Sequence, residues 1–247
     1  MTQIQKVEKG SFALLPGTEI EKTVISAEER LIPKILAIQH TSDKAKDKHN
    51  DAEPGQMRDT VENKLFGEVG KPFEFIPFAH KHFWSTYNMQ KGGQGEFIQD
   101  FPINAGNSNL KKEELVDGVP IKRVKTYEFY ILIPSELNEG NGYPYVLSFR
   151  STSYRGGQVL LSQFEKNQLS ELPPWGVVCD LVLSEDSNDK GDFFVQSVVP
   201  KRVVDQNEHL KANQWYLTFK QGKAGKVDDS DTRNYSEETP KAKQDKF

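Results

Sequence analysis

FEFIPFAHKHFWSTYNM, residues 73–89, is the densest cluster of aromatic residues in the chain and contains two of its five histidines. It predicts a β-strand, in which successive side chains point to opposite faces. If Pro77 does not shift the alternation, one face carries Ile76, Phe78, His80, His82 and Trp84, and the other carries Phe73, Phe75, Ala79, Lys81 and Phe83. Both faces are rich in rings. One is therefore core, and the other either packs inside the protein or meets a flat ligand.

The segments that follow predict more strands and one helix. KTYEFYILIP (125–134) and YPYVLSFRSTS (143–153) are separated by the turn-forming run NEGNGYP, so we expect a hairpin. Apolar residues at helical spacing predict an amphipathic helix over 154–172. WGVVCDLVLSED (175–186) and DFFVQSVVPKRVV (192–204) are two further strands joined by a turn, and QWYLTFK is the last apolar segment.

Taken in chain order, these elements predict a β-rich α+β protein. The arrangement is compatible with an OB-like Greek-key barrel that has insertions and one internal amphipathic helix. We place a single core domain at residues 26–220. Residues 1–25 show little periodicity and are expected to form an N-terminal arm, and residues 221–247 a disordered C-terminal tail.

Composition excludes several classes of protein. The chain of 247 residues has a net charge of −4 and a pI near 5.8. These values exclude a uniformly basic nucleic-acid binder, but not a basic groove on an acidic protein. The single cysteine, Cys179, cannot form an internal disulfide or a zinc knuckle. Because no run of about 18 apolar residues is present, we expect no membrane contact and a cytoplasmic location.

No catalytic motif stands out. The sequence lacks the GxSxG, Walker A and GxGxxG patterns. His80 and His82 lie two residues apart, a spacing that can ligate a metal, but no third ligand is evident. We therefore expect neither an enzyme nor a cofactor or bound metal.

Aromatic and basic residues interleave in the strands instead. Lys122, Arg123 and Lys125 precede or enter the strand that contains TYEFYILI. Farther on, Phe149 precedes Arg150 and Tyr154 precedes Arg155. Proteins that bind single-stranded nucleic acid use this mixture, because cations follow the phosphates while rings stack on bases without reading their edges.

The layout resembles phage-encoded single-stranded DNA-binding proteins. The resemblance is carried by IPKILAIQ, a polar loop and FEFIPFAHKHFW, by TYEFYILIP with YPYVLSFRSTSYRGGQVLLSQF, and by a tail that ends at Phe247; it spans about residues 30–220. It implies an OB-type core, a role in phage DNA replication and recombination, and a mobile tail that recruits replication proteins. The tail departs from the acidic pattern of such proteins, because Lys241, Lys243 and Lys246 lie close to Phe247.

These observations predict sequence-independent binding of single-stranded DNA. The expected DNA contacts are Lys81, His82, Trp84, Tyr87, Lys122, Arg123, Lys125, Tyr130, Arg150, Tyr154 and Arg155. The expected partner-docking residues of the tail are Asp228, Asp229, Asp231 and Phe247. The alternative is a protein-interaction or virion-associated β-domain without nucleic-acid binding, whose aromatic strands pack against a neighbouring subunit. The oligomeric state stays open.

Overall fold

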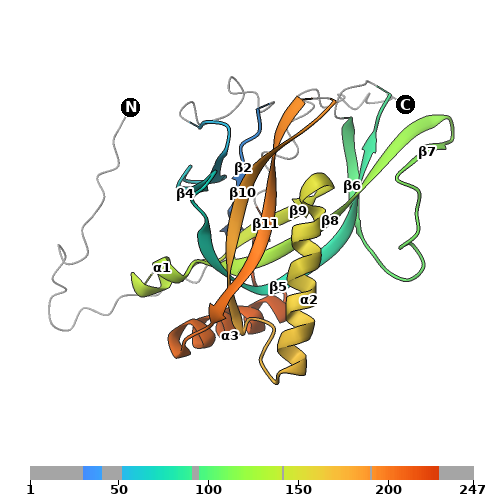
Figure 1. Cartoon of the computed structure of the whole chain (residues 1–247). Helices are drawn as coiled ribbons and strands as arrows, with labels where there is room; N and C mark the ends of the chain where they lie inside the picture. The colour runs from blue at the N-terminus through green and yellow to red at the C-terminus, as the bar shows by residue number, and fades with distance from the viewer. Residues whose placement is uncertain (1–29, 41–51, 91–94, 141, 190, 228–247) are drawn as a thin grey trace, which may run out of the picture.

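The architecture is β-rich, with helices packed on a large mixed sheet (Figure 1). The computed structural model describes residues 30–40, 52–90, 95–140, 142–189 and 191–227. The expected arm at 1–25 therefore lies outside the described residues. The expected tail is described only as far as Val227, where residues 226–227 form a short strand.

The strands and helices have the following bounds. The strands are β1 Leu31–Ile32, β2 Lys34–Ala37, β3 Gln56–Asp59, β4 Leu65–Glu68, β5 Phe73–Asn88, β6 Glu96–Pro102, β7 Glu113–Val116, β8 Val119–Leu132, β9 Tyr145–Arg150, β10 Val177–Asn188, β11 Gly191–Val203 and β12 Lys226–Val227. The helices are α1 Pro134–Asn138, the 3-10 turn η1 Ser151–Ser153, α2 Tyr154–Leu169 and α3 Gln206–Lys220.

Ten of these strands form one open sheet. Its order is β11-β10-β5-β8-β9-β2-β3-β4, with β6 paired to β5 and β7 paired to β8. The β2–β9 pair is parallel and the other pairs of this sheet are antiparallel. A separate parallel pair joins β1 to β12, so the two ends of the described chain lie side by side.

The strand β5 pairs with three other strands, β10, β8 and β6, and its two ends have different partners. Phe73–Phe75 pairs with β10, whereas the rest of the strand pairs with β8. A register shift lies between Pro77 and Ala79. Proline cannot donate a hydrogen bond to the ladder and is tolerated at such bulges. Pro77 therefore does shift the alternation, and the predicted division of β5 into two faces is wrong beyond this point.

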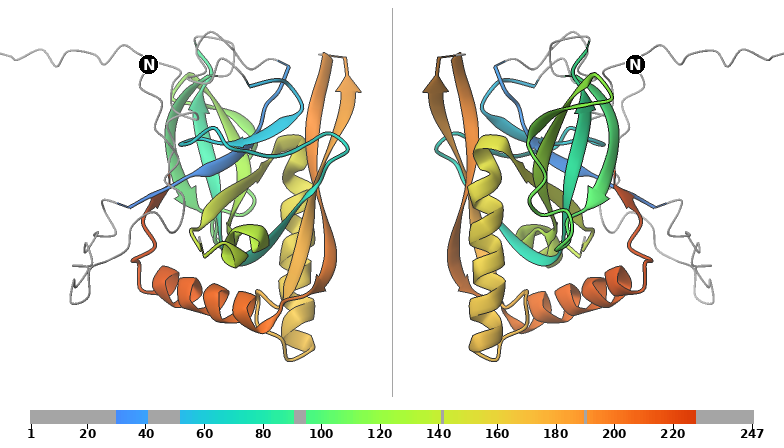
Figure 2. Two further views of the ribbon diagram at one scale, coloured as in Figure 1. Left: turned by 90° about the vertical axis from the view of Figure 1, so that its left-hand side faces the viewer. Right: turned by 90° about the vertical axis from the view of Figure 1, so that its right-hand side faces the viewer.

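Two apolar clusters cover the two faces of the sheet. One joins Phe75, Phe129 and Phe149 of the sheet to Leu160 and Phe164 of α2. The other contains Ile32, Ile76, Phe78, Tyr130, Val146 and Ala212, and the α3 rings Trp215, Tyr216 and Phe219 pack against it. Figure 2 shows α2 upright beside β10 and β11, and α3 across the lower end of the molecule.

The start of α2 lies unusually close to the sheet. A Cβ atom added to Gly157 would lie 2.5 Å from Cδ2 of Tyr127, and one added to Gly156 would lie 2.7 Å from the Phe149 ring. Only glycine allows this approach without a shift of the neighbouring rings. The pair of glycines thus sets the distance between α2 and the strands β8 and β9.

Both predicted hairpins and the predicted amphipathic helix are confirmed. β8 pairs with β9, β10 pairs with β11, and α2 occupies most of the expected range. The expectation of one internal helix is wrong, because α1 and α3 are helical as well. QWYLTFK forms the second half of α3, which begins at a capping box between Asp205 and Glu208. No helix in the described part of the chain is long and apolar enough to cross a membrane.

Candidate functional site

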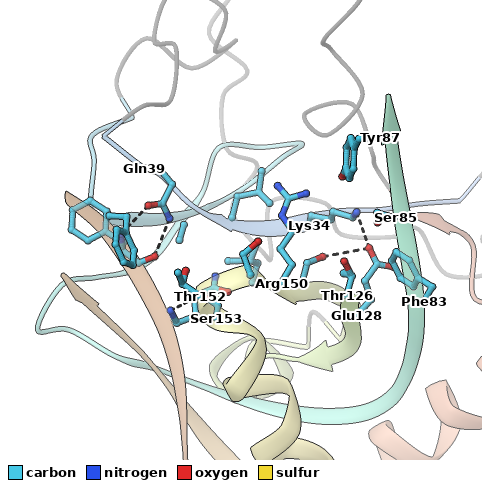
Figure 3. Close-up of a pocket in the computed structure, with 18 of the residues that line it drawn as sticks. Lys34, Gln39, Phe83, Ser85, Tyr87, Thr126, Glu128, Arg150, Thr152 and Ser153 are labelled. Carbon is cyan, nitrogen blue, oxygen red and sulfur yellow. Dashed lines mark hydrogen bonds and ion pairs between the residues drawn. The ribbon is translucent and has the colours of Figure 1, made fainter. Parts of the chain in front are cut away.

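A groove of about 310 Å³ opens on the side of the sheet formed by β8 and β9 (Figure 3). Its walls come from β2, from the second half of β5, from β6, from η1 and from the start of β11. Its lining includes Lys34, Gln39, Phe83, Ser85, Tyr87, Phe97, Asp100, Thr126, Glu128, Ser148, Arg150, Thr152, Ser153, Asn188, Phe194 and Gln196. Several strands thus contribute alternate side chains to one concave surface.

The floor of the groove is polar and contains a buried ion pair between Lys34 and Glu128. Lys34 Nζ lies 2.8 Å from Glu128 Oε1, and only 6% and 9% of these side chains are exposed. Ser148 Oγ donates a hydrogen bond of 3.3 Å to the same carboxylate oxygen. Beside them, Thr126 Oγ1 is buried without a hydrogen-bond partner. A buried ion pair of this kind adds polarity to the floor without adding net charge.

The rim of the groove combines rings with cations. Tyr87 and Phe97 meet edge to face, with ring centroids 5.9 Å apart. Arg150 is exposed, and its guanidinium pairs with no carboxylate of the described residues. Lys122 lies directly across from Tyr87 in the β5–β8 ladder, so the two side chains share a face. Half-buried rings beside cations are the chemistry that holds a flat, negatively charged polymer.

Hydrogen bonds fix the far wall of the groove. Gln39 Nε2 donates to the carbonyl oxygen of Phe194 at 3.1 Å, and the Phe194 amide donates to Gln39 Oε1 at 2.8 Å. The Gln196 amide donates to Ser153 Oγ at 3.0 Å. These bonds tie β11 to the chain after β2 and to η1, so this wall is firmly held.

A second ring cluster lies on the opposite face of β8. His82 stacks on Tyr127 with centroids 4.0 Å apart, and Tyr127 stacks on Tyr154 at 4.7 Å. Tyr154 Oη donates to Tyr127 Oη at 3.0 Å. Burial lowers the pKa of His82, and Lys125 and His80 lower it further. Burial and the bond to Tyr127 raise the pKa of Tyr154. These rings stack on one another, away from the groove.

Two of the rings expected to stack on bases are buried. Trp84 is 1% exposed, and its Nε1 donates to the carbonyl oxygen of Asn107 at 3.0 Å. Tyr130 is also 1% exposed and packs against Phe219 with centroids 4.7 Å apart. A base cannot reach either ring in this structure, so their assignment as stacking residues is corrected.

The expected cations are also divided between sites. Arg123 forms an ion pair with Glu114 at 2.5 Å. Lys125 donates to the carbonyl oxygen of Ser108 at 2.9 Å and lies over Trp84. Lys81 lies over the Tyr130 ring. Arg155 is exposed but does not line the groove. Of the predicted contacts, Tyr87 and Arg150 line the groove and Lys122 lies beside it.

The floor of the groove and one ring of its rim are not among the residues predicted from the sequence. Lys34, Phe97, Thr126 and Glu128 all line the groove. Lys34 had a visible signal, since it is an isolated charge within the apolar run IPKILAIQ. Phe97, Thr126 and Glu128 come together in the groove through strand pairing that the sequence does not show. The expected docking residues Asp228, Asp229, Asp231 and Phe247 lie outside the described residues.

The described residues contain no group of three or more His, Cys, Asp or Glu side chains placed to hold a metal ion. Cys179 is buried, and burial together with Asp180 raises the pKa of its thiol to about 12. A thiol of this kind is not a ready nucleophile at neutral pH.

Comparison with known proteins gives one match. A family model described as Pam3 phage gp34-like protein matches residues 18–225. No curated protein and no solved structure matches the chain. The matched range covers all the strands and helices of the groove.

Proposed function

The chain belongs to the Pam3 phage gp34-like protein family, and we propose that this phage protein binds single-stranded DNA, whatever its overall sequence, in the groove over β8 and β9. The observation that carries the proposal is the rim, where Tyr87 and Phe97 lie on the same concave surface as Arg150. Rings stack on any base and a cation beside them contacts phosphate, so the surface suits a single strand.

The position of the groove supports the same function. Five neighbouring strands of the sheet are, from first to fifth in the chain, β5, β8, β9, β10 and β11. Across the sheet they lie in the order fifth, fourth, first, second and third. The helix α2 comes between the third and the fourth of them in the chain. We take this order as support for an OB-like core, because OB barrels bind oligonucleotides on their second and third strands, between the loops that follow the first and fourth. The groove lies on β8 and β9, and its lining includes Phe97, from the first of these connections, and Asn188, the last residue of β10 before the second.

The chain departs from a simple OB barrel at one edge. In such a barrel the third and fifth strands close the structure, whereas here β2 pairs in parallel with the outer edge of β9. The contact between the third-strand region and β11 is made instead by η1, through Ser153 and Gln196. We therefore propose an OB-like core that is extended by β2, β3 and β4.

Moderate affinity is expected from so few contacts. Each base that stacks on a ring contributes about 1–3 kcal/mol. Tyr87 and Phe97 provide two rings, and Arg150 and Lys122 provide cations near them. A small set of this kind binds reversibly, as is needed of a protein that covers single strands during phage replication and recombination in the host cytoplasm. Docking of replication proteins on the C-terminal tail belongs to the same proposal.

A pair of arginine variants tests the groove. Fluorescence anisotropy of a labelled oligo-dT would be titrated at low salt with the wild type, Arg150→Ala and Arg155→Ala. Both arginines are exposed, but only Arg150 lines the groove. A lost charge-assisted contact lowers affinity by about 1.5–3 kcal/mol, or roughly 10-fold to 150-fold.

The proposal expects that loss for Arg150→Ala and little change for Arg155→Ala. Equal losses of affinity for the two variants would mean that DNA binds outside the groove. A wild type that fails to bind at tens of micromolar would refute DNA binding and favour the protein-interaction hypothesis.

A further inference from the structure

The floor of the groove contains a polar group that the fold itself does not use. Thr126 is 4% exposed, and its Oγ1 has no hydrogen-bond partner. Buried hydroxyl groups are nearly always paired, because an unpaired one destabilises the protein. Thr126 belongs to the lining of the groove, where Figure 3 places it between Arg150 and Glu128. What distinguishes this hydroxyl is its place in the lining of the groove, where it is available to pair with a bound ligand.

The groups around Thr126 supply both donors and acceptors. Glu128 presents a carboxylate, which already receives Lys34 and Ser148 on Oε1. Lys34 presents an ammonium group at the same place. The edge of a nucleobase carries donors and acceptors side by side, and a threonine hydroxyl can pair with either kind. The floor is therefore complementary to the edge of a base, whereas the rim is complementary to its flat face and to phosphate.

We infer that the floor is a hydrogen-bonding subsite for one nucleobase, with the Thr126 hydroxyl as its central contact. The inference rests on the proposed function and adds to it a dependence on base identity at one position of the strand. Thr126 Oγ1 is screened from solvent in the ligand-free protein. A base reaches it when a neighbouring long side chain turns aside, and Arg150, which stands across from Thr126 in the β8–β9 ladder, is exposed.

The chain offers a matched control for this threonine. Thr86 is 5% exposed and its Oγ1 is also buried without a partner. It lies between Ser85 and Tyr87 on β5, both of which line the groove, so its own side chain points to the opposite face. Valine keeps the shape of threonine and removes the hydroxyl. Thr126→Val and Thr86→Val therefore make the same chemical change on the two faces of the sheet.

The test compares labelled strands of dT, dC and dA with a strand of abasic sites. For the wild type we expect affinities that differ among the bases. Thr126→Val should weaken binding to the preferred base about fivefold, the effect of one hydrogen bond, and leave the abasic strand unchanged. Thr86→Val should bind every strand like the wild type. Thr126→Ser keeps the hydroxyl and should keep the base preference.

The outcomes separate the subsite from the proposed function. A wild type that binds no strand refutes the proposed function and the subsite with it. A wild type that binds all three bases equally, or a Thr126→Val variant that binds each strand like the wild type, refutes the subsite alone. Equal weakening by Thr126→Val and Thr126→Ser also refutes it, because the loss would then come from packing. Circular dichroism of each variant verifies that it is folded.

Discussion

Removal of one partner of the buried ion pair in the groove floor should destabilise the protein strongly. Lys34→Met replaces the ammonium group with an apolar end of similar length and leaves Glu128 facing Ser148 at 3.3 Å. Only 9% of the Glu128 side chain is exposed, so water would solvate the unpaired carboxylate poorly. Breaking a buried pair in this way costs about 3–5 kcal/mol. Because the Ser148 hydroxyl still contacts the carboxylate, we expect a value near the lower limit, about 3 kcal/mol.

The double variant should recover most of this loss. Lys34→Met with Glu128→Leu removes both charges, and apolar replacement of a buried pair is often neutral. We expect the double variant to lie within about 1 kcal/mol of the wild type, which gives a coupling energy of about 2 kcal/mol or more. The contrast between single and double variant separates the cost of an unpaired charge from the cost of altered packing.

Urea denaturation followed by circular dichroism measures both values. The midpoint should fall in Lys34→Met with an unchanged m-value, since the surface exposed on unfolding stays the same. A loss of less than about 1 kcal/mol in Lys34→Met would contradict this expectation, since it would mean that water solvates Glu128 well. A double variant as unstable as the single one would also contradict it, because packing would then account for the loss.

Three further predictions concern packing, pH and salt. Gly157→Ala should destabilise the protein by about 1–2 kcal/mol in urea denaturation, because the new Cβ meets Tyr127 Cδ2 at 2.5 Å and overpacking outweighs the gain in helix propensity; a more stable variant would contradict the close approach of α2. Burial lowers the pKa of His82 in the folded protein below its ordinary value of 6.5. As the pH falls, the unfolded chain therefore binds the proton before the folded protein does, and the free energy of unfolding decreases as the pH falls through about 6.5. The melting temperature of the wild type should therefore drop more between about pH 7.5 and 5.5 than that of His82→Gln, and equal drops would show that His82 does not contribute. For DNA binding, contacts from Arg150 and Lys122 alone predict a slope of about −1.4 in log affinity against log salt, at ~0.7 per phosphate, whereas all six expected cations would give about −4.2. A steep slope would mean that cations outside the groove bind DNA.

The local pattern of the sequence predicts several elements of the fold. Alternating runs locate β5, β8, β9, β10 and β11, and helical spacing locates α2. The second half of α3 was seen only as an apolar segment, although the spacing of Asp205 and Glu208 is a helix-start signal. The turn that joins β7 to β8 is likewise visible in the sequence, because the pair Asp117-Gly118 favours the positive φ that both residues adopt.

The site is less predictable because it depends on contacts between distant segments. A single bulge at Pro77 decides which side chains of β5 face the groove. Trp84 has the composition of a stacking residue, yet Asn107 and Lys125 cover it. Conversely, Thr126 has no unusual feature in the sequence and becomes notable only through its place in the lining. Residue type predicts the chemistry of a site, and strand pairing decides which residues share it.

Binding of single-stranded DNA in the groove over β8 and β9 can be measured directly. The most direct measurement is the dissociation constant of the wild type for a labelled oligo-dT at low salt, followed by competition with unlabelled single-stranded and duplex DNA. We predict saturable binding that single strands displace and that duplex DNA displaces poorly, because stacking on Tyr87 and Phe97 requires unpaired bases. No binding at tens of micromolar protein, or equal displacement by duplex DNA, would contradict the claim.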